Sequence, residues 1–174
     1  YPGPISGLVG QNPSPQAQAH VDGPGQQRDA AHAAGVGAEI DVVIGGKTDD
    51  QHGASVVTRA KVQTLSDGKY VHHGAMMRGL AGEFGPMAVL QVGGVEVVVS
   101  TYRRQLLDRD MLRIVDIDPR TRRLLVVKSA VHFRADLGPL ADTIFDADTP
   151  GIHRPDFQCF QYDRLRRPVY PLDP

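Results

Sequence analysis

The chain has 174 residues, of which 41% are hydrophobic and 22% charged, and its formal net charge is -1. This length and composition fit one globular domain, and the near-neutral charge gives no reason to expect a nucleic-acid or membrane partner. No apolar run approaches the roughly 18 residues of a transmembrane helix, and we find no signal peptide. The one cysteine, Cys159, excludes an internal disulfide and suits a reducing, cytoplasmic compartment.

Residues 1–29 are rich in Gly, Pro, Gln and Ser, and their apolar residues are sparse and show no period. Such a segment cannot bury enough apolar surface to offset the entropy that is lost on ordering. We therefore predict a disordered N-terminal lead.

The next part of the chain is predicted to contain one helix and two strands. A short helix over 28–34 ends at Gly35 or Gly37, and the apolar run 38–44 is typical of a strand. After a polar loop at 47–53, alternation over residues 54 to 65 predicts a second strand. One face of this strand is expected to carry Val56, Thr58, Ala60, Val62 and Thr64.

Turn-forming residues divide the middle of the chain. Ser66 to Lys69 (SDGK) is a turn signal, which predicts that residues 70–73 pair back onto the preceding strand. Strands over 87–92 and 95–100 are joined through Gly93-Gly94 as a second hairpin. Between the hairpins, packing roles in a short irregular or helical piece are expected for Met76, Met77, Leu80 and Phe84.

The last third of the chain is predicted to contain a helix over 106–115 and a buried strand over 124–127. A second helix is expected from the spacing of Leu137, Leu140, Ala141 and Ile144, with Pro139 in its first turn. Beyond Gly151 we expect an extended tail whose apolar side chains pack onto a surface, namely Phe157, Phe160, Tyr162, Leu165 and Tyr170.

Helices and strands interleave in this reading, and hairpin signals are frequent. The predicted fold class is therefore α/β in the broad sense, of the α+β type, with a mixed, largely antiparallel β-sheet and a few packed helices.

A polar cluster follows the predicted strand over 124–127. It consists of Lys128, Ser129, His132 and Arg134. In open α/β sheets the loop after a strand faces the ligand crevice, so the cluster could bind an anionic group such as a substrate carboxylate. Alternatively, these side chains cap the following helix and pair with Asp136 or Asp142. Composition and spacing leave the two interpretations even.

Metal binding has little support in the sequence, which lacks an HExxH motif. His72 and His73 are adjacent, so on a strand their rings point to opposite faces and cannot share a metal ion. Asp49, Asp50 and His52 lie on one loop and could bind a divalent ion, although a solvated acidic loop explains them better.

Covalent catalysis and phosphate binding are also poorly supported. Ser129 lies beside Lys128, but no GxSxG elbow is present, and adjacent side chains on a strand end do not normally meet. The Gly45-Gly46 and Gly93-Gly94 pairs are too short for a phosphate-binding loop. We predict no catalytic residue and no metal ligand in this chain.

Five segments carry a resemblance to a known family. They read AAHAAGVGAEIDVVIGGKTDDQHG, LSDGKYVHHGAMMRGL, GPMAVLQVGGVEVVVSTYRRQLLDRDMLRIVDIDP, VVKSAVHFRADLGPLADTIFDADTPGI and RLRRPVYPLDP. In this order they resemble the C-terminal domain of the microcystinase C (MlrC) family of zinc metallopeptidases. The resemblance begins at about Ala30, which divides the chain into an unmatched lead, 1–29, and an MlrC C-terminal-like domain, 30–174.

This resemblance implies a bacterial hydrolase whose full-length members bind zinc and cleave linear peptides or related amides, as in microcystin degradation. It implies that zinc and the catalytic groups belong to an N-terminal domain, the expected partner. The present domain would then be inactive alone, hold no cofactor and help to form the cleft for a peptide-like substrate. The alternative is an accessory or anion-binding module that docks on a separate catalytic chain.

The resemblance also singles out particular residues. The family motif KS-x-x-HFR marks candidates for the substrate cleft, as positioning or structural groups, at Lys128, Ser129, His132, Phe133 and Arg134. Asp116 departs from the family pattern, because a glycine is common there before the Ile-Asp-Pro turn. The lead departs as well, since it replaces a Gly-rich entry segment and a helix, which implies an open sheet edge.

Overall fold

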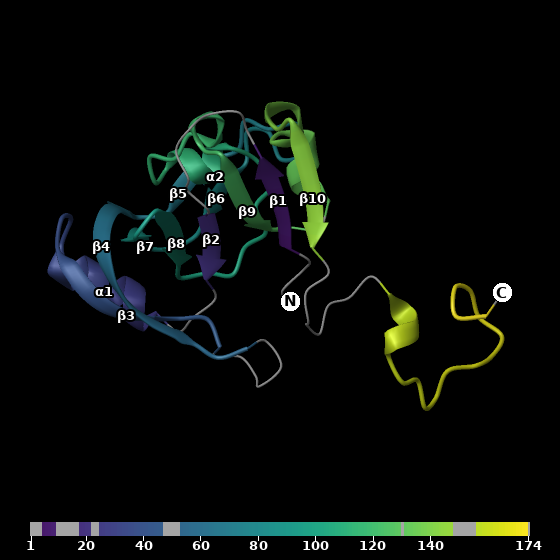
Figure 1. The fold of residues 1–174 in the computed structure, drawn as a ribbon. Coiled ribbons are helices and arrows are strands. Elements are labelled where there is room, and N and C mark those ends of the chain that lie inside the picture. Colours follow the sequence, from purple (N-terminus) through teal and green to yellow (C-terminus); the bar gives the residue numbers. More distant parts are fainter. Residues whose placement is uncertain are drawn as a thin grey trace.

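The computed structural model describes residues 5–9, 18–21, 25–46, 53–129, 131–147 and 156–173. These residues form three β-sheets with short helices around them (Figure 1). The predicted α+β class with a largely antiparallel sheet is confirmed. Of the predicted polar loop at 47–53, only Gly53 is described.

The largest sheet has five strands in the order β2-β8-β7-β4-β3. β2 is parallel to β8, and the other neighbours are antiparallel. The predicted hairpin through Gly93-Gly94 is confirmed, with Met87 opposite Ser100 and Val92 opposite Val95. The strands are β2 (Gln18–Val21), β3 (Glu39–Ile44), β4 (Val56–Ser66), β7 (Met87–Val92) and β8 (Val95–Ser100).

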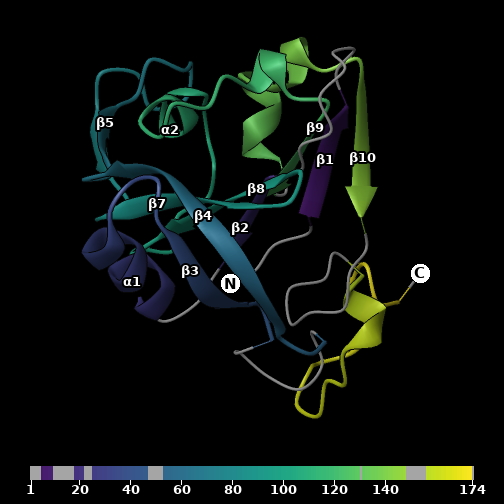
Figure 2. The same ribbon diagram turned by 60° about the vertical axis from the view of Figure 1, so that its left-hand side comes forward.

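A second sheet has the order β10-β1-β9, and all its pairs are antiparallel. It consists of β10 (Thr143–Ala147), β1 (Ile5–Val9) and β9 (Leu124–Lys128). β9 also lies beside β2, so the two larger sheets adjoin (Figure 2). β9 confirms the predicted strand over 124–127.

Residues 1–29 contribute β1, β2 and the first residues of helix α1 (Gln26–Ala34), and the other residues up to 24 lie outside the described residues. The predicted helix over 28–34 is confirmed, and it ends where expected. The Gly35 N–H donates to the Ala31 carbonyl at 2.9 Å, and Gly35 has a φ of 84°, which a side chain would disfavour.

Two clusters of buried side chains lie on opposite faces of the five-stranded sheet. Because side chains alternate along a strand, Met87 and Val89 enter one cluster while Ala88 and Leu90 enter the other. The first cluster, which we call the inner core, also contains Phe84, Val98, Met111, Leu112, Val115, Ile117, Leu125, Val127, Phe133 and Leu137. The second, the helix-side core, also contains Ala31, Val42, Ala60, Val62, Val97 and Val99.

β4 follows its predicted pattern only as far as Val62. Ala60 and Val62 are 2% and 0% exposed, as the alternation predicts. The register then shifts between Val62 and Thr64, which leaves Gln63 as the extra residue of a bulge. A bulge inverts the alternation beyond it, so Leu65 packs against the helix-side core in place of Thr64.

The prediction that residues 70–73 pair with the strand over 54–65 is wrong. The turn exists, with the Lys69 N–H donating to Asp67 Oδ1 at 3.0 Å, but it leads into a separate two-stranded sheet. There β5 (Lys69–Val71) pairs with β6 (Ala81–Glu83). The predicted packing roles hold for Phe84 but not for the residues between β5 and β6, since large exposed fractions are found at Met76, Met77 and Leu80.

The predicted helix over 106–115 is much shorter in the structure, where α2 spans Asp110–Arg113. The chain leaves α2 through a C-terminal cap in which Asp116 has a φ of 59°. The Ile117 N–H donates to the Leu112 carbonyl at 3.1 Å, and the Asp116 N–H donates to the Arg113 carbonyl at 3.0 Å. These two bonds form a Schellman motif, in which the residue with positive φ is usually glycine. Asp116, which replaces the glycine common in the family, therefore occupies a position whose backbone conformation favours glycine.

The prediction of a helix through Leu137 and Ile144 is wrong. Two short 3₁₀ turns, η2 (His132–Ala135) and η3 (Gly138–Leu140), are followed by strand β10, which contains Ile144. Another 3₁₀ turn, η1 (Pro119–Thr121), precedes β9. Leu137 is fully buried in the inner core, and Leu140, Ala141 and Ile144 pack against it, so the apolar spacing reflects burial without a helix.

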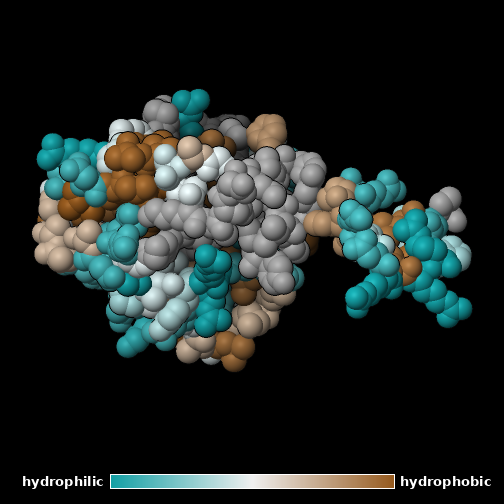
Figure 3. All heavy atoms as spheres, turned by 90° about the horizontal axis from the view of Figure 1, so that it is seen from below, coloured by the Kyte–Doolittle hydropathy of each residue, from teal (hydrophilic) through white to brown (hydrophobic). Residues whose placement is uncertain are grey.

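Residues 156–173 lie to one side of the sheets and contain a 3₁₀ turn, η4 (Phe157–Cys159) (Figure 1). The prediction that their apolar side chains pack onto a surface is wrong, because exposed fractions of 36–90% are found at Phe157, Phe160, Tyr162, Leu165 and Tyr170. Figure 3 shows hydrophobic residues of this segment between hydrophilic ones. No helix in the described ranges has the length and hydropathy to cross a membrane.

We predict that Asp116→Gly stabilises the fold by about 0.5–1 kcal/mol, because glycine adopts a positive φ without the penalty that an L-residue incurs. Urea denaturation of the wild type and the variant measures this difference. Asp116→Ala is the matched control and should lose stability. Equal stabilities for the glycine and alanine variants would contradict the assignment of strain to this position.

Candidate functional site

The candidate site begins at the end of β9, where Lys128 is half-buried and Ser129 is 1% exposed. The Gln105 side-chain amide donates to Ser129 Oγ at 2.9 Å. β9 belongs to an antiparallel sheet, so the rule that placed a ligand crevice after a strand of an open parallel sheet does not apply here. The strand end instead holds a buried hydroxyl that connects it to the segment before α2.

The next three candidates, in η2, differ sharply in their surroundings. His132 is exposed, whereas Phe133 is 0% exposed and belongs to the inner core. Arg134 donates to both carboxylate oxygens of Asp146 in β10, at 2.6 and 2.7 Å, and its guanidinium lies 5.3 Å from the centre of the Phe133 ring. The KS-x-x-HFR motif therefore combines one core residue, one ion-paired residue and one solvent-facing imidazole.

Neither predicted carboxylate partner of this cluster, Asp136 or Asp142, pairs with Arg134. Asp136 instead accepts hydrogen bonds from the Arg109 backbone N–H at 2.8 Å and from the Arg109 guanidinium at 2.9 Å. These bonds to Arg109 lower the pKa of Asp136, against the opposing effect of its burial. The salt bridge fastens the turn after η2 to the N-terminus of α2.

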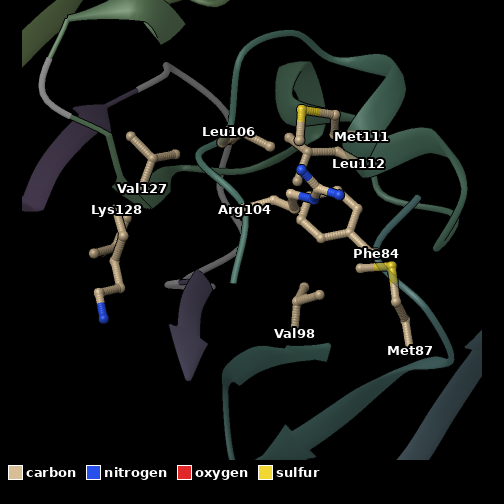
Figure 4. Close-up of a pocket in the computed structure, with 10 residues that line it drawn as sticks. Phe84, Met87, Val98, Arg104, Leu106, Met111, Leu112, Val127 and Lys128 are labelled. Carbon is tan, nitrogen blue, oxygen red and sulfur yellow. The ribbon is translucent and has the colours of Figure 1, made fainter. Parts of the chain in front are cut away.

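A small apolar cavity of about 30 Å3 lies in the inner core next to this region (Figure 4). Its wall includes Phe84, Met111 and Leu112, with Arg104 and Lys128 as the cationic residues that line it. Figure 4 shows the Lys128 side chain directed away from the apolar residues. A space of this size admits about two water molecules at most, so it is not a substrate pocket in this domain.

A second polar site lies where α2 meets β5, and sequence reasoning missed it. His72 Nδ1 and Asp108 Oδ2 are 2.6 Å apart, and the exposed fractions of the two side chains are 5% and 4%. The sequence singled out His72 only as half of an unsuitable metal pair. Asp108 is 36 residues away from His72 in the sequence, so no local sequence pattern could predict the contact.

The neighbouring His73–Asp110 pair has a different geometry. Asp110 accepts a hydrogen bond from the His73 backbone N–H at 2.9 Å, while the His73 ring lies 3.3 Å away and its side chain is 73% exposed. The Arg113 guanidinium also donates to Asp110, at 2.9 Å. The pKa of Asp110 is lowered: its burial acts to raise it, and the hydrogen bonds from His73 and Arg113 outweigh that effect. His72 is therefore buried and His73 exposed, in keeping with the prediction that adjacent rings diverge.

The other sequence candidates contribute little to a site. Asp49, Asp50 and His52 lie outside the described residues. Among the residues that are described, no group of three or more His, Cys, Asp or Glu side chains could hold a metal ion. Cys159 is exposed.

Comparisons with known proteins agree on one family. The family model described as MlrC C-terminus matches residues 22–164, so it begins eight residues before the resemblance noted in the sequence. Microcystinase C from Sphingomonas sp is 23% identical over 141 residues, which are 81% of this chain and 26% of the relative. The crystal structure of a proposed metallopeptidase from Mesorhizobium sp. BNC1 has a TM-score of 0.77 at 27% identity.

That solved structure matches 92% of this chain, but the match covers only 32% of its own length. The chain thus spans about a quarter of the curated relative and about a third of the solved protein.

We predict that Phe133→Ala lowers the free energy of unfolding by about 3–5 kcal/mol, because it leaves a cavity in the inner core. His132→Ala, one residue away and exposed, should change it by less than about 0.5 kcal/mol. Chemical denaturation of both variants tests the division of the motif into structural and solvent-facing parts, and similar losses for the two would contradict it.

We also predict a pH-dependent contribution from Asp136. Its folded-state pKa lies below the ordinary value of 3.8, so the ionised carboxylate stabilises the fold above that value and loses this effect as the pH falls through the folded pKa. Asp136→Asn should cost about 1–2 kcal/mol at neutral pH. In denaturation curves at decreasing pH, the gap between wild type and variant should close below about pH 4, and a constant gap would refute this cause.

Proposed function

Because the chain belongs to the MlrC C-terminus family over residues 22–164, we propose that it is the C-terminal, cleft-forming domain of a zinc metallopeptidase. In the proposed full-length protein the reaction is hydrolysis of peptide or related amide bonds. The observation that carries this proposal is the family match, which covers most of the chain, supported by the metallopeptidase-like solved neighbour.

The described residues of this domain do not provide a binding site for the zinc ion of the proposed enzyme. The closest acid–imidazole contacts, His72–Asp108 and His73–Asp110, are separate pairs and supply no set of three ligands. We propose that zinc is held by the N-terminal catalytic domain, the intramolecular partner, and that this chain is inactive alone. The relatives are long enough for such a domain, since most of their length lies outside the match.

The residues of the KS-x-x-HFR motif are assigned two kinds of role in this proposal. His132 is exposed and Lys128 half-buried, so these two are the candidates for contact with a peptide-like substrate in the interdomain cleft. The other three support them: Ser129 through Gln105, Phe133 through the inner core and Arg134 through Asp146. We propose a bacterial, cytoplasmic protein with no nucleic-acid or membrane partner.

The second candidate function is an accessory or anion-binding module that docks on a separate catalytic chain. The exposed apolar side chains of the tail favour it, because such side chains are typical of surfaces that a partner covers. In this case the catalytic partner would be another polypeptide, and the domain would again lack activity by itself.

Elemental analysis and a peptidase assay on the purified chain test the proposal. We expect no stoichiometric zinc and no hydrolysis of a linear peptide, with or without added zinc, whereas Microcystinase C assayed in parallel serves as the positive control. Zinc at one ion per chain together with hydrolysis would overturn the assignment of catalysis to another domain. Co-purification with a separate zinc-containing chain would favour the accessory module.

A further inference from the structure

β10 forms one edge of the three-stranded sheet and lies at the margin of the molecule in Figure 2. β1 pairs with it on one side, and no described strand pairs with it on the other. In an antiparallel pair, every second residue of an edge strand directs its backbone N–H and C=O away from the partner strand. The outer side of β10 therefore presents a row of backbone donors and acceptors along five residues, a length of about 17 Å.

The side chains of β10 leave this edge accessible to solvent. Ile144 packs against the inner core, so the alternation of a strand directs its neighbours Thr143 and Phe145 to the opposite face. Both neighbours are exposed, and the exposed fraction of Phe145 is 57%. A large aromatic side chain on an accessible edge strand provides contact area for the side chains of a strand that is added beside it.

β10 lacks the features that usually prevent another strand from adding to a sheet. Native edges are commonly blocked by proline or by charged side chains. β10 contains no proline, and its one charged residue, Asp146, accepts hydrogen bonds from the Arg134 guanidinium at 2.6 and 2.7 Å. This ion pair offsets the charge of Asp146, and it also connects β10 to the KS-x-x-HFR motif, so the edge is continuous with the candidate site.

The length of the edge favours a peptide over a second copy of the chain as its partner. Stable protein–protein interfaces involve about 20–30 residues on each side, which an edge of five residues does not provide. An extended peptide needs only about four or five residues to pair along such an edge, and its main-chain hydrogen bonds supply the affinity. Alternate side chains of the peptide would then lie next to Phe145.

We propose that β10 is the strand to which a linear peptide substrate adds, as a fourth strand of the three-stranded sheet, with Phe145 packing against alternate peptide side chains. This inference deepens the proposed function, on which the identification of the peptide as a substrate rests. Binding at β10 breaks no bond, so it is compatible with a domain that is inactive alone. The domain holds the peptide extended beside the KS-x-x-HFR motif, and the proposed catalytic domain supplies the reacting groups.

Titration of the 174-residue chain with the peptide acetyl-Lys-Val-Thr-Val-Thr-Val-Lys-amide, followed in ¹H–¹⁵N NMR spectra, tests the proposal. We expect chemical-shift changes and slower amide exchange at residues 143–147. Phe145→Thr, which keeps a residue suited to strands, should weaken binding about threefold to fivefold because the cross-strand contact is lost. Phe157→Thr is the matched control, since Phe157 is 52% exposed but lies in the tail, and it should leave the dissociation constant unchanged.

Two N-methylated forms of the peptide separate strand pairing from simple apolar contact. One form carries N-methyl groups on its valines and the other on its threonines, so each lacks the N–H groups on one side of the extended peptide. Only one side of an added strand faces β10. One form should therefore bind at least about tenfold more weakly than the other. Equal affinities of the two forms, or no binding of the unmodified peptide, would overturn the proposal.

The spectra of the wild-type chain also test for a competing partner, and they need no variant. If the β10 amide signals move with protein concentration in the absence of peptide, the edge pairs with a second copy and the proposal is overturned. These outcomes are independent of the zinc and peptidase tests. Failure to bind the peptide leaves the assignment of the domain standing, whereas zinc together with hydrolysis overturns that assignment whatever the binding at β10.

Discussion

β7 is the strand on which both hydrophobic cores depend, because its buried residues are enclosed on both faces of the five-stranded sheet. Met87 and Val89 face the inner core and Ala88 and Leu90 face the helix-side core, and all four are 0–1% exposed. Neither face tolerates a polar group or a change in register, since a shift by one residue would exchange the two sets. The position of α1 on one side and of α2 and β9 on the other follows from this strand.

The polar groups of the molecule are organised around the segment that contains α2. Three carboxylates connect it to its surroundings: Asp108 contacts His72, Asp110 holds the His73 backbone, and Asp136 binds Arg109. Each bond joins parts of the chain more than 25 residues apart. The inner core brings these segments together, and the carboxylates then fix their orientation, which apolar packing alone does not specify.

Local patterns in the sequence predict the strands over 38–44, 87–92, 95–100 and 124–127, but they miss β6, and they predict a helix where β10 begins. The run over 95–100 and the Gly93-Gly94 pair are sufficient for a hairpin because strand and turn are both local properties. Partner choice is not local: the turn at Gly68 is correctly placed, but the strand after it pairs with residues 81–83. Spacing near Leu137 suggests a helix because burial in a compact turn produces similar intervals.

The candidate site shows the same difference between local patterns and non-local contacts. The motif around Lys128 is visible in the sequence, but its division into core and solvent-facing residues depends on tertiary packing. Phe133 is a core residue because the inner core surrounds it, and a sequence pattern of five residues contains no information on that. The His72–Asp108 contact is even harder to predict from the sequence, since it joins a loop after β5 to the segment before α2.

The edge of the five-stranded sheet affects whether separate molecules of the protein associate in solution. Among the described strands β3 lies at this edge, and it carries the exposed acidic residues Glu39 and Asp41 beside the inward Ile40 and Val42. Charge on an edge strand discourages a strand of a second molecule from adding to the sheet. Without these two charges the same edge would be a template for intermolecular β-pairing, so Glu39 and Asp41 help to keep separate molecules of the domain from associating through this strand.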